Sequence, residues 1–385
     1  MHVDGEMQCL LNDAALELGR LDGLAINLPN PDLFLSMYVR KEALLSSQIE
    51  GTQASLDDVL AYEVQAQSHR SKDAVEVVNY VRAMNYGLER LKTFPLSLRL
   101  IREIHGVMLE GVRGGEKLPG EFRKSQNWIG SAGSTIETAD FVPPPPHEVQ
   151  AALANFEKFL HSKLAIPALL RCALVHAQFE TIHPFLDGNG RIGRLLITFL
   201  LCHDGVLRRP LLYLSYYFKI HRSEYYDRLN AVRFEGDWEG WLKFFLRGVV
   251  EVARQAAETA KRILDMRASH LETVRKARPK GSTNALRLLD LLYMAPYQSA
   301  SATSETLKIS VPTANSLLST FQGIGILREV TQASWGRIYA YKPYLDLLRE
   351  GTEITASSST TGDESRQKTR IRVRKREKSR HARRT

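Results

Sequence analysis

One stretch of the chain, TIHPFLDGNGRIGRLL (Thr181–Leu196), restricts the possible folds more than any other. Its three glycines have the spacing G-x-G-x-x-G, which is typical of the loop that binds a dinucleotide in a Rossmann fold. That fold needs a buried strand before the loop and an acidic residue about 20 positions after it. Here a helical pattern and Pro184 precede the glycines, and Arg208 and Arg209 stand where the acid is needed. The sequence therefore excludes a Rossmann fold.

The same residues suit a phosphate group that is bound in another way. Glycines let backbone N–H groups approach an anion closely, and the loop opens a helix whose N-terminus carries partial positive charge. Arg191 and Arg194 are three residues apart, so they share one face of that helix. Asp187 is an oxygen ligand of the kind that Mg²⁺ accepts beside a polyphosphate, and His183 is a candidate base at neutral pH. Together these residues predict a catalytic site for a phosphate-containing substrate.

Helical signals dominate the rest of the chain. Pro31 begins a helical pattern that Gly51 ends, and the following SLDD has the form of a capping box that opens another helix. Pro167 and Pro184 bound a further helix, in which we expect His176 to be a packing residue. The only clear β signal in the first 250 residues lies around NWIGSAGSTIETADFVPPPP, where a Gly/Ser turn separates two short extended runs. We expect a mostly helical region with one short hairpin.

The C-terminal third of the chain has a different organisation. A long, charged helical segment breaks at Pro279 and Gly281 and is a plausible linker helix. Three short helical patterns and a turn-centred hairpin follow, which is the order of elements in a winged helix. The Ser/Thr-rich segment after Arg349 has no apolar periodicity, so we expect it to be disordered. The expected organisation is an N-terminal helical region (1–95), a catalytic core (96–250), a linker helix (251–282), a winged-helix domain (283–349) and a basic tail (350–385).

The excess positive charge belongs to the tail. The net charge of the chain is +9, yet residues 366–385 hold eleven Lys or Arg and one acid, Glu377, so the first 365 residues carry about −1. Such a tail binds nucleic acid or another polyanion, or is simply a solvated end. The three cysteines have neither metal-ligand nor disulfide-framework spacing, and no signal peptide or long apolar run is evident. We expect a cytoplasmic protein with no membrane partner.

The segment HPFLDGNGRIGR resembles, at every fixed position, the signature H-P-F-x-[DE]-G-N-G-R-x-x-R of the Fic family. PGEFRKSQNWIG resembles the segment that leads into the Fic flap, and YYDRLNAVRFEGDWEGWLKFFLRGV resembles the helical region after the core, so the resemblance covers most of residues 30–250. The fold that it implies is a mostly α Fic core with a short β-hairpin flap, joined here to a small C-terminal winged-helix domain.

The resemblance implies a protein adenylyltransferase, which transfers AMP from ATP to a Ser, Thr or Tyr hydroxyl of a target protein or of itself. His183 would deprotonate that hydroxyl, and Asp187 would hold Mg²⁺ between the α- and β-phosphates. Arg191 would neutralise charge on the β-phosphate, and Arg194 would bind the γ-phosphate. The ATP-binding residues implied by the family pattern are Gly188, Asn189, Gly190, Arg191, Arg194, Tyr225 and Tyr226. Some relatives carry Asn where this chain has Arg233, which leaves a polar contact with the adenine edge open.

The N-terminal segment SSQIEG resembles the inhibitory motif [ST]-x-x-x-E-[GN] of the same family, with Ser46, Glu50 and Gly51 at its fixed positions. We expect the helix that ends at Gly51 to deliver the Glu50 carboxylate to Arg194 as a bidentate pair, where the γ-phosphate would bind. ATP bound beside that pair would have its α-phosphate turned away from attack. The alternative is that Glu50 only caps or solubilises a helix end.

Other functions stay open at this point. One is a nucleotide-sensing transcriptional regulator that binds DNA through the winged helix and the basic tail. Its recognition helix (312–321) contains no Lys or Arg, which makes it a weak reader of DNA. Another keeps the enzyme but changes the phosphate-containing donor. The sequence does not name the target protein, and it leaves the oligomeric state open between a monomer and a homodimer.

Overall fold

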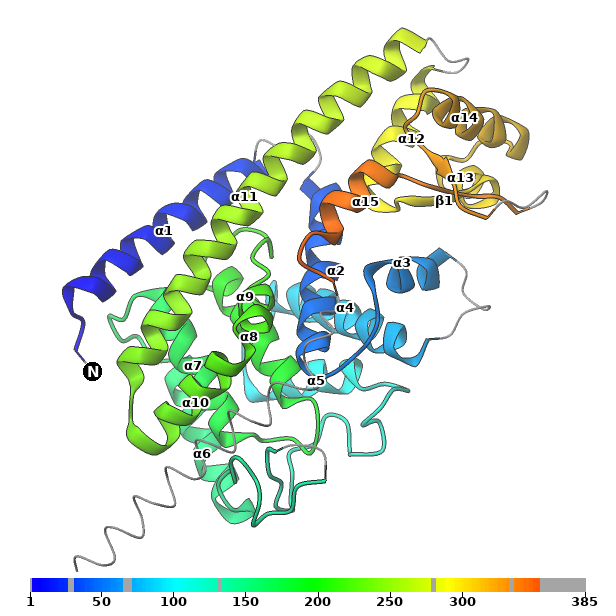
Figure 1. Cartoon of the computed structure of the whole chain (residues 1–385). Helices are drawn as coiled ribbons and strands as arrows, with labels where there is room; N and C mark the ends of the chain where they lie inside the picture. Colours follow the sequence, from blue (N-terminus) through cyan, green and yellow to red (C-terminus); the bar gives the residue numbers. More distant parts are fainter. Residues whose placement is uncertain are drawn as a thin grey trace, which may run out of the picture. The chain divides into compact units, whose positions relative to one another are not determined.

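Figure 1 shows the computed structural model of the chain, which describes residues 2–26, 31–64, 71–130, 133–277, 282–331 and 336–353. These residues are mostly helical, and their strands form a three-stranded antiparallel sheet in the order β1-β3-β2. Contacts divide the chain into two units, Met1–Thr352 and Glu353–Thr385, and only the first is described below. The helices are α1 (Gly5–Ile26), α2 (Pro31–Ile49), α3 (Leu56–Val64), α4 (Lys72–Leu91), α5 (Leu98–Met108), α6 (Pro146–Leu160), α7 (Ala168–Ile182), α8 (Asn189–His203), α9 (Ser215–Ile220), α10 (Arg222–Glu235), α11 (Trp238–Ala277), α12 (Ser282–Met294), α13 (Ala300–Leu307), α14 (Val311–Gly323) and α15 (Lys342–Arg349), and the strands are β1 (Tyr297–Ser299), β2 (Arg328–Glu329) and β3 (Ile338–Ala340).

The expected mostly helical fold is confirmed, and several local signals act as predicted. Pro31 is the first residue of α2, and Gly51, just after that helix, has a φ of 95°, a conformation that favours glycine. The capping box forms as expected, because Ser55 N donates to Asp58 Oδ2 (2.8 Å) and Asp58 N donates to Ser55 Oγ (3.2 Å). Among the described helices, none is long and apolar enough to cross a membrane.

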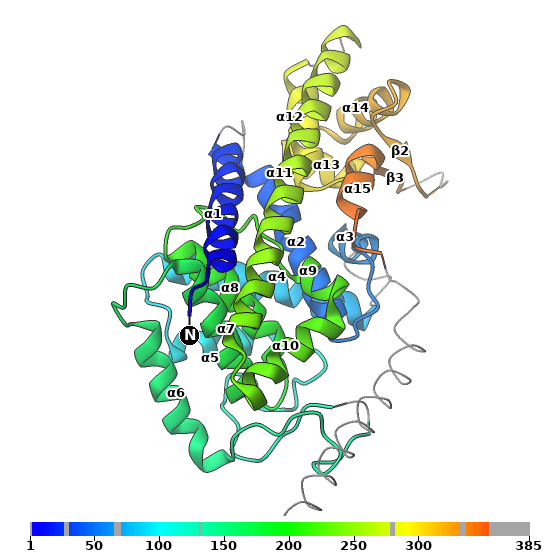
Figure 2. The same cartoon turned by 60° about the vertical axis from the view of Figure 1, so that its left-hand side comes forward.

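Helix α11 is 40 residues long and lies side by side with α1 (Figures 1 and 2). Buried residues continue along it from Trp241 to Ile263, so the helix runs without a break through residue 250. The predicted boundary between core and linker therefore falls inside one helix, and the domain division stays a prediction. The predicted breaks at Pro279 and Gly281 lie outside the described residues.

Helices α7 and α8 pack against each other and carry the glycine loop between them. Helix α4 packs on α8 through a close approach at Gly87, where a Cβ would lie 2.4 Å from the Phe199 ring and 3.0 Å from Ile104. Because Phe199 is fully buried, it cannot move aside without disturbing the core.

We expect Gly87→Ala to lower the free energy of unfolding by about 1–3 kcal/mol, although alanine is the better helix former, because overpacking outweighs helix propensity here. Gly19→Ala in α1 is the matched control, since no atom lies within 4 Å of its Cβ position, and it should leave stability equal or raise it. Thermal and urea unfolding of the two variants measure the difference. Equal or greater stability of Gly87→Ala would contradict the packing argument.

The C-terminal segment contains the expected three helices, α12, α13 and α14, followed by the β2–β3 pair. Strand β1, between α12 and α13, and helix α15, after β3, were not predicted. In the sheet, Ala340 of β3 pairs with Tyr297 on one side and with Arg328 on the other. This order is compatible with a winged helix, and that assignment stays a prediction. Tyr297 Oη donates to Asp57 Oδ1 at 2.7 Å, which joins this segment to α3.

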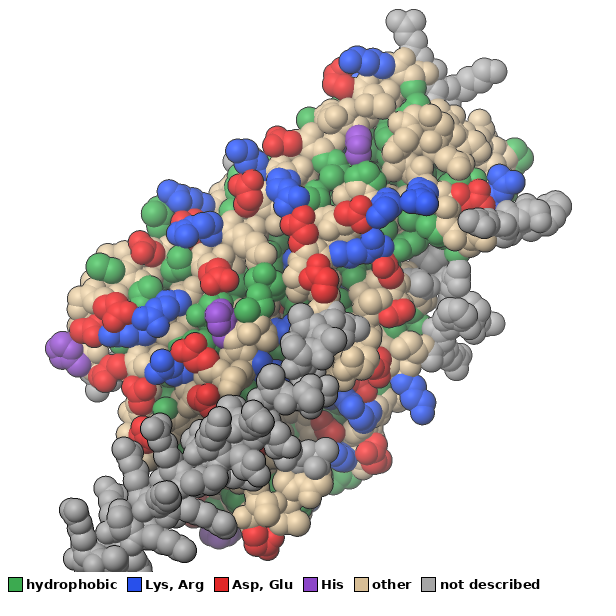
Figure 3. Space-filling view, in the orientation of Figure 1, with side chains coloured by type: hydrophobic (Ala, Val, Ile, Leu, Met, Phe, Trp, Pro, Cys, Tyr) green, Lys and Arg blue, Asp and Glu red, His purple; other side chains and the backbone are tan. Residues whose placement is uncertain are grey.

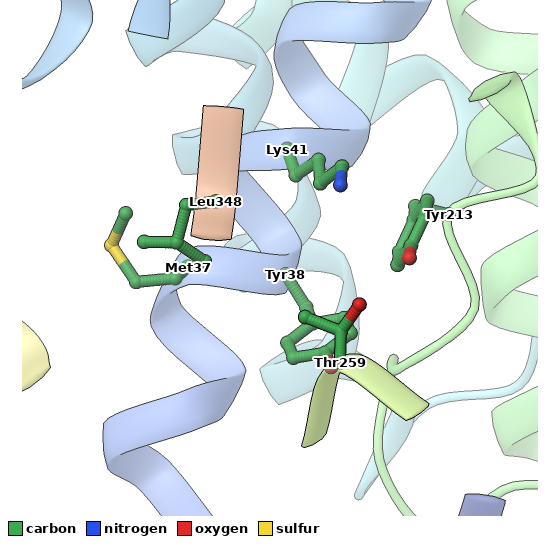
Figure 4. A pocket seen from close by; sticks show the side chains of 6 residues that line it. All are labelled: Met37, Tyr38, Lys41, Tyr213, Thr259 and Leu348. Atoms are coloured by element: carbon green, nitrogen blue, oxygen red, sulfur yellow. The ribbon is translucent and has the colours of Figure 1, made fainter. Parts of the chain in front are cut away.

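A small cavity lies between α2, the Tyr213 loop, α11 and α15 (Figure 4). The Lys41 ammonium points toward the Tyr213 ring, 4.6 Å from its centroid, and donates to the Glu350 carbonyl at 2.7 Å. This buried contact secures the middle of α2 to the chain just after α15. The lining residues are Met37, Tyr38, Lys41, Tyr213, Thr259 and Leu348.

Charged side chains of both signs are interspersed on the face in Figure 3, as the near-neutral charge of the first 365 residues predicts. The predicted disordered tail lies outside the described residues from position 354 onward.

In the described part of the expected flap hairpin, which lacks residues 131–132, the pairing is one antiparallel bridge between Ile129 and Phe141. Ile129 N donates to the Phe141 carbonyl at 2.8 Å, and Phe141 N donates back at 3.1 Å. The ladder cannot extend beyond Val142 because Pro143–Pro146 have no N–H groups to donate.

Candidate active site

The catalytic loop connects the end of α7 to the start of α8. Helix α7 stops at His183, whose φ is 49°, and Gly188 precedes α8 with a φ of 75°. The Asn189 side chain closes the loop, since Phe185 N donates to its Oδ1 and its Nδ2 donates to the Phe185 carbonyl, both at 2.8 Å. The first N–H groups of α8 have no partner within the helix, so this N-terminus can bind an anion.

His183 is held by its backbone rather than by its ring. Its carbonyl accepts from Arg123 Nε (3.0 Å) and Asn127 Nδ2 (3.4 Å), while Nδ1 is buried with no hydrogen-bond partner among the described residues. Burial lowers the pKa of His183 to about 4, and Arg233 acts in the same direction. The imidazole is therefore neutral at physiological pH and can accept a proton.

Asp187 lies at the mouth of the loop with its side chain 26% exposed. Gly188 N and Lys117 Nζ donate to its two oxygens at 2.6 and 3.1 Å, and an Arg191 nitrogen is 3.6 Å away. A single accessible carboxylate fits Mg²⁺, which usually takes one or two carboxylates and completes its shell with phosphate oxygens and water. Lys117 would then have to release that oxygen.

Arg191 is almost fully buried and only partly engaged. Its NH1 lies 3.7 Å from Glu76 Oε2, yet neither Nε nor NH1 has a hydrogen-bond acceptor in the part of the chain that the structure describes. Buried donors without acceptors are costly, and a phosphate at the start of α8 would satisfy them. This guanidinium thus fits an anionic ligand beside the loop.

Arg194 brings the expected inhibitory residues to the loop. Its Nε donates to Ser46 Oγ (2.8 Å), and its NH2 donates to the Ser46 carbonyl (3.0 Å) and to Glu50 Oε1 (2.7 Å). Burial opposes both charges, but their attraction outweighs it, so the pKa of Arg194 is raised and that of Glu50 is lowered. The expected bidentate pair is wrong, because Glu50 accepts one of these three hydrogen bonds and Ser46 accepts the other two.

Gly190 makes room for the Glu50 carboxylate. A Cβ at Gly190 would lie 2.2 Å from Glu50 Oε1 and 3.0 Å from Arg194 NH1. The second glycine of the loop therefore lets the backbone approach an anion, and in this structure that anion is Glu50.

The two tyrosines of α10 have different surroundings. Tyr225 is buried, its ring stacks on Phe218 with centroids 4.5 Å apart, and its hydroxyl contacts His176 Nε2 at 2.9 Å. Tyr226 is only half-buried, with Arg222 over its ring. Tyr225 thus belongs to the aromatic core, and Tyr226 is the better candidate to contact a nucleoside. His176 lies in the core, as expected of a packing residue.

Three residues that position the site were missed by the sequence analysis. His105 stacks on Phe185 (centroids 3.7 Å apart) and contacts the Asp187 carbonyl at 3.0 Å, and Glu76 lies beside Arg191. Arg123 joins the flap segment to the end of α7 through His183. Arg123 stood inside the segment PGEFRKSQNWIG, whose resemblance could have identified it. The local patterns around His105 and Glu76 carry no such signal.

Arg233 lies near the end of α10. It donates to Asn230 Oδ1 (3.0 Å) and to the Glu180 carbonyl (2.9 Å), and its guanidinium lies 4.0 Å from the Phe141 ring centroid. It therefore connects α10 with α7 and the flap.

Comparison with known proteins gives two family matches. Residues 9–89 match the Fic/DOC family N-terminal model, and residues 95–201 match the Fic/DOC family model. A probable protein adenylyltransferase of Aquifex aeolicus is 29% identical over 177 residues, which are 45% of this chain and 51% of that protein. The protein adenylyltransferase Fic of Aedes aegypti is 36% identical over 151 residues, which are 39% of this chain and 27% of that protein. The chain thus matches about half or less of these relatives' length.

Solved structures support the fold. A Fic family protein from Desulfovibrio desulfuricans aligns with a TM-score of 0.59 at 19% identity, over 89% of this chain and 97% of that one. A Fic domain-containing signaling protein from Bacteroides thetaiotaomicron aligns with a TM-score of 0.52 at 19% identity, over 65% of this chain and 97% of that one.

Proposed function

This chain belongs to the Fic/DOC family over residues 9–201, and we propose that it is an autoinhibited protein adenylyltransferase. It transfers AMP from ATP to a Ser, Thr or Tyr hydroxyl of a target protein and of itself. One observation carries this proposal: a neutral histidine, an accessible carboxylate and a partly unengaged arginine surround one helix N-terminus. Relatives named protein adenylyltransferase support the same class of reaction.

The reaction follows from the positions of these groups. The hydroxyl oxygen attacks the α-phosphorus, its proton passes to the His183 imidazole, and the bond from the α-phosphorus to the bridging oxygen breaks as pyrophosphate leaves. Arg191 and the first N–H groups of α8 stabilise the negative charge that moves onto the phosphates. Asp187 would hold Mg²⁺, which neutralises phosphate charge when it is bound.

Inhibition rests on Glu50. Its carboxylate accepts a hydrogen bond from the Arg194 guanidinium and fills the space over Gly190. A triphosphate would need both the guanidinium and this space. Ser46 holds the same guanidinium from the preceding turn of α2. Withdrawal of this helix end would expose Arg194 to the γ-phosphate, so the resting protein is expected to be a slow enzyme.

The direct test is mass spectrometry of the purified protein after incubation with Mg-ATP, with a parallel incubation with α-labelled ATP and a cell extract. We expect the protein to gain one AMP, and labelled AMP to appear on extract proteins. Transfer of label from γ-labelled ATP instead would show phosphoryl transfer and would refute this function. No transfer from either nucleotide, even by a variant freed of inhibition, would also refute it.

The pH dependence should reflect the lowered pKa of His183. A base is active when deprotonated, so a pKa of about 4 keeps kcat/KM nearly constant from pH 8 down to about pH 5. Activity should fall only as the pH approaches 4. Initial rates at low ATP concentration across this range measure kcat/KM. A decline centred near pH 6.5 would show that the pKa of the base is not lowered.

Nucleic-acid binding through the basic tail stays a prediction, as does the oligomeric state. Deleting residues 354–385, which keeps the Glu350 and Thr352 carbonyls that hold α2, should lower any DNA affinity and reduce its salt dependence, because residues 366–385 hold the excess positive charge. AMP transfer should be unchanged. Gel shifts at several salt concentrations measure the effect, and equal binding by full-length and truncated protein would assign DNA binding to the folded part.

A further inference from the structure

Glu180 is a buried carboxylic acid that the reaction described above does not use. It lies in α7, three residues before His183, and is 5% exposed. Its Oε1 atom has no hydrogen-bond partner among the residues that the structure describes. A Cβ at Gly193 would lie 2.2 Å from this oxygen, so the third glycine of the loop makes room for the Glu180 carboxyl.

The Tyr225 hydroxyl cannot donate to Glu180. His176 Nδ1 lies 2.9 Å from the Gly193 carbonyl, an acceptor, so Nδ1 carries the ring proton. Burial lowers the pKa of His176 to about 3, so the ring is neutral and Nε2 is an acceptor. The Tyr225 hydroxyl, 2.9 Å from Nε2, must therefore donate its only proton there. Nothing remains for Glu180.

The neighbouring arginines are directed elsewhere as well. Arg194 uses its Nε and NH2 groups for Ser46 and Glu50. Arg233 donates to the backbone carbonyl of Glu180, not to its carboxyl group. Among the described residues, neither arginine donates a hydrogen bond to the Glu180 carboxyl group, although Arg233 Nε is itself buried without an acceptor.

Glu42 provides a matched comparison within the same protein. It is equally buried, and burial raises its pKa to about 7, as it does for Glu180. Glu42 nevertheless accepts from Ser215 N, Ser215 Oγ and Tyr80 Oη. Of these two buried acids, Glu42 accepts hydrogen bonds from protein donors, whereas Glu180 Oε1 accepts none from the described residues.

We propose that Glu180 is a specificity residue that accepts a hydrogen bond from an N–H or O–H group of the bound donor nucleoside. This inference depends on the proposed function, in which the donor is ATP. The carboxyl group lies against Gly193 of α8, one residue before Arg194, and the charges of Arg194, Arg233 and Glu50 act on it, as its own charge acts on Tyr226. If a nucleotide bound with its phosphates at Arg194 and its nucleoside beside Tyr226, the nucleoside would therefore lie next to the Glu180 carboxyl group. The donor group is the base amine or a ribose hydroxyl.

A cycle of protein and ligand changes tests this contact. The background is the full chain with Glu50→Gly and His183→Ala, which removes inhibition and prevents turnover. Calorimetry with Mg²⁺ would compare ATP with 2′-deoxy-ATP, 3′-deoxy-ATP and purine riboside triphosphate, which lacks the base amine. At pH 8, where a carboxyl group with a pKa of about 7 is mostly ionised, we expect Glu180→Met to weaken ATP binding by about 10- to 100-fold, the range for a hydrogen bond to a charged group. For one of the three analogues, that loss should vanish.

The analogue whose loss vanishes identifies the donor group, because removing either side of one hydrogen bond makes removal of the other harmless. The proposal would be overturned if Glu180→Met lowered the affinity for ATP and for all three analogues equally, or if it did not lower the affinity for ATP. If Glu180→Met does not fold, Glu180→Gln keeps the shape, and its smaller loss, about 3- to 10-fold, should vanish for the same analogue. Glu42→Gln should leave the ratio of affinities for ATP and each analogue unchanged. Because the cycle measures binding alone, a protein that binds as expected but transfers no AMP would refute the proposed function and not this contact.

Discussion

Glu50→Gly is expected to raise AMP transfer, including self-modification, by at least about 10-fold, which corresponds to about 1.4 kcal/mol of relieved misalignment. The structure gives the physical reason. Glu50 Oε1 lies 2.7 Å from Arg194 NH2 and at the place that a Gly190 side chain would occupy. Removing the carboxylate leaves Arg194, which keeps its charge at any physiological pH, available to the γ-phosphate. The measurement is the initial rate of transfer from α-labelled ATP.

Several variants separate release of inhibition from general loosening. Glu50→Gln keeps the shape but loses the charge, so it should also activate. Ser46→Ala removes one of the partners of Arg194 but leaves Glu50 in place, so a smaller increase is expected. Glu110→Gly, at an exposed acid outside the loop, should have no effect. Unchanged or lower transfer by Glu50→Gly would mean that Glu50 is structural.

His183→Ala is expected to lower the transfer rate by about 10²- to 10⁴-fold, the usual contribution of a general base. ATP affinity should be retained, because in the proposed function the imidazole accepts a proton while the phosphates would be bound by Arg191, Arg194 and the start of α8. The expectation depends on a histidine that is neutral at pH 7, as its lowered pKa of about 4 requires. Transfer rates in the Glu50→Gly background, with calorimetry of ATP binding, measure both quantities.

An exposed histidine controls for nonspecific effects. His147 has a side chain that is 79% exposed and lies outside the loop, so His147→Ala should transfer AMP at the rate of its parent. If His183→Ala transfers AMP at that rate too, the base assignment is wrong. Loss of ATP binding together with transfer would instead indicate that His183 supports the loop.

Much of the fold could be predicted because its signals are local. Pro31, Gly51 and the Ser55–Asp58 capping box act within a few residues of themselves, and each forms as expected. The extent of the flap was harder to predict, since alternating residues indicate extended chain but not how many pairs will form. The proline run stops the pairing on one side of the bridge between Ile129 and Phe141.

The site was only partly predictable for a related reason. The residues with candidate chemical roles in the loop are close together in the sequence, whereas the residues that position them are distant in the sequence. His105 lies 82 residues before Asp187, whose carbonyl it contacts. Tyr225 and Tyr226 are adjacent in sequence, yet one enters the aromatic core and the other stays half-buried. Helical rotation of about 100° per residue separates their environments.

The sequence by itself determined the parts of the site that depend on backbone geometry within one turn. Glycines in a loop, a helix N-terminus and arginines three residues apart require no distant partner to define an anion site. Only the tertiary structure decided how that site is occupied. The packing of α2 beside α8 brings Ser46 and Glu50 to Arg194, which is 148 residues from the first and 144 from the second, and gives the carboxylate one hydrogen bond instead of two. The packing of α7 against α8 leaves Glu180 Oε1 beside Gly193 without a hydrogen-bond partner among the described residues. Hydrogen bonds between helices depend on side-chain positions that a local sequence pattern does not specify.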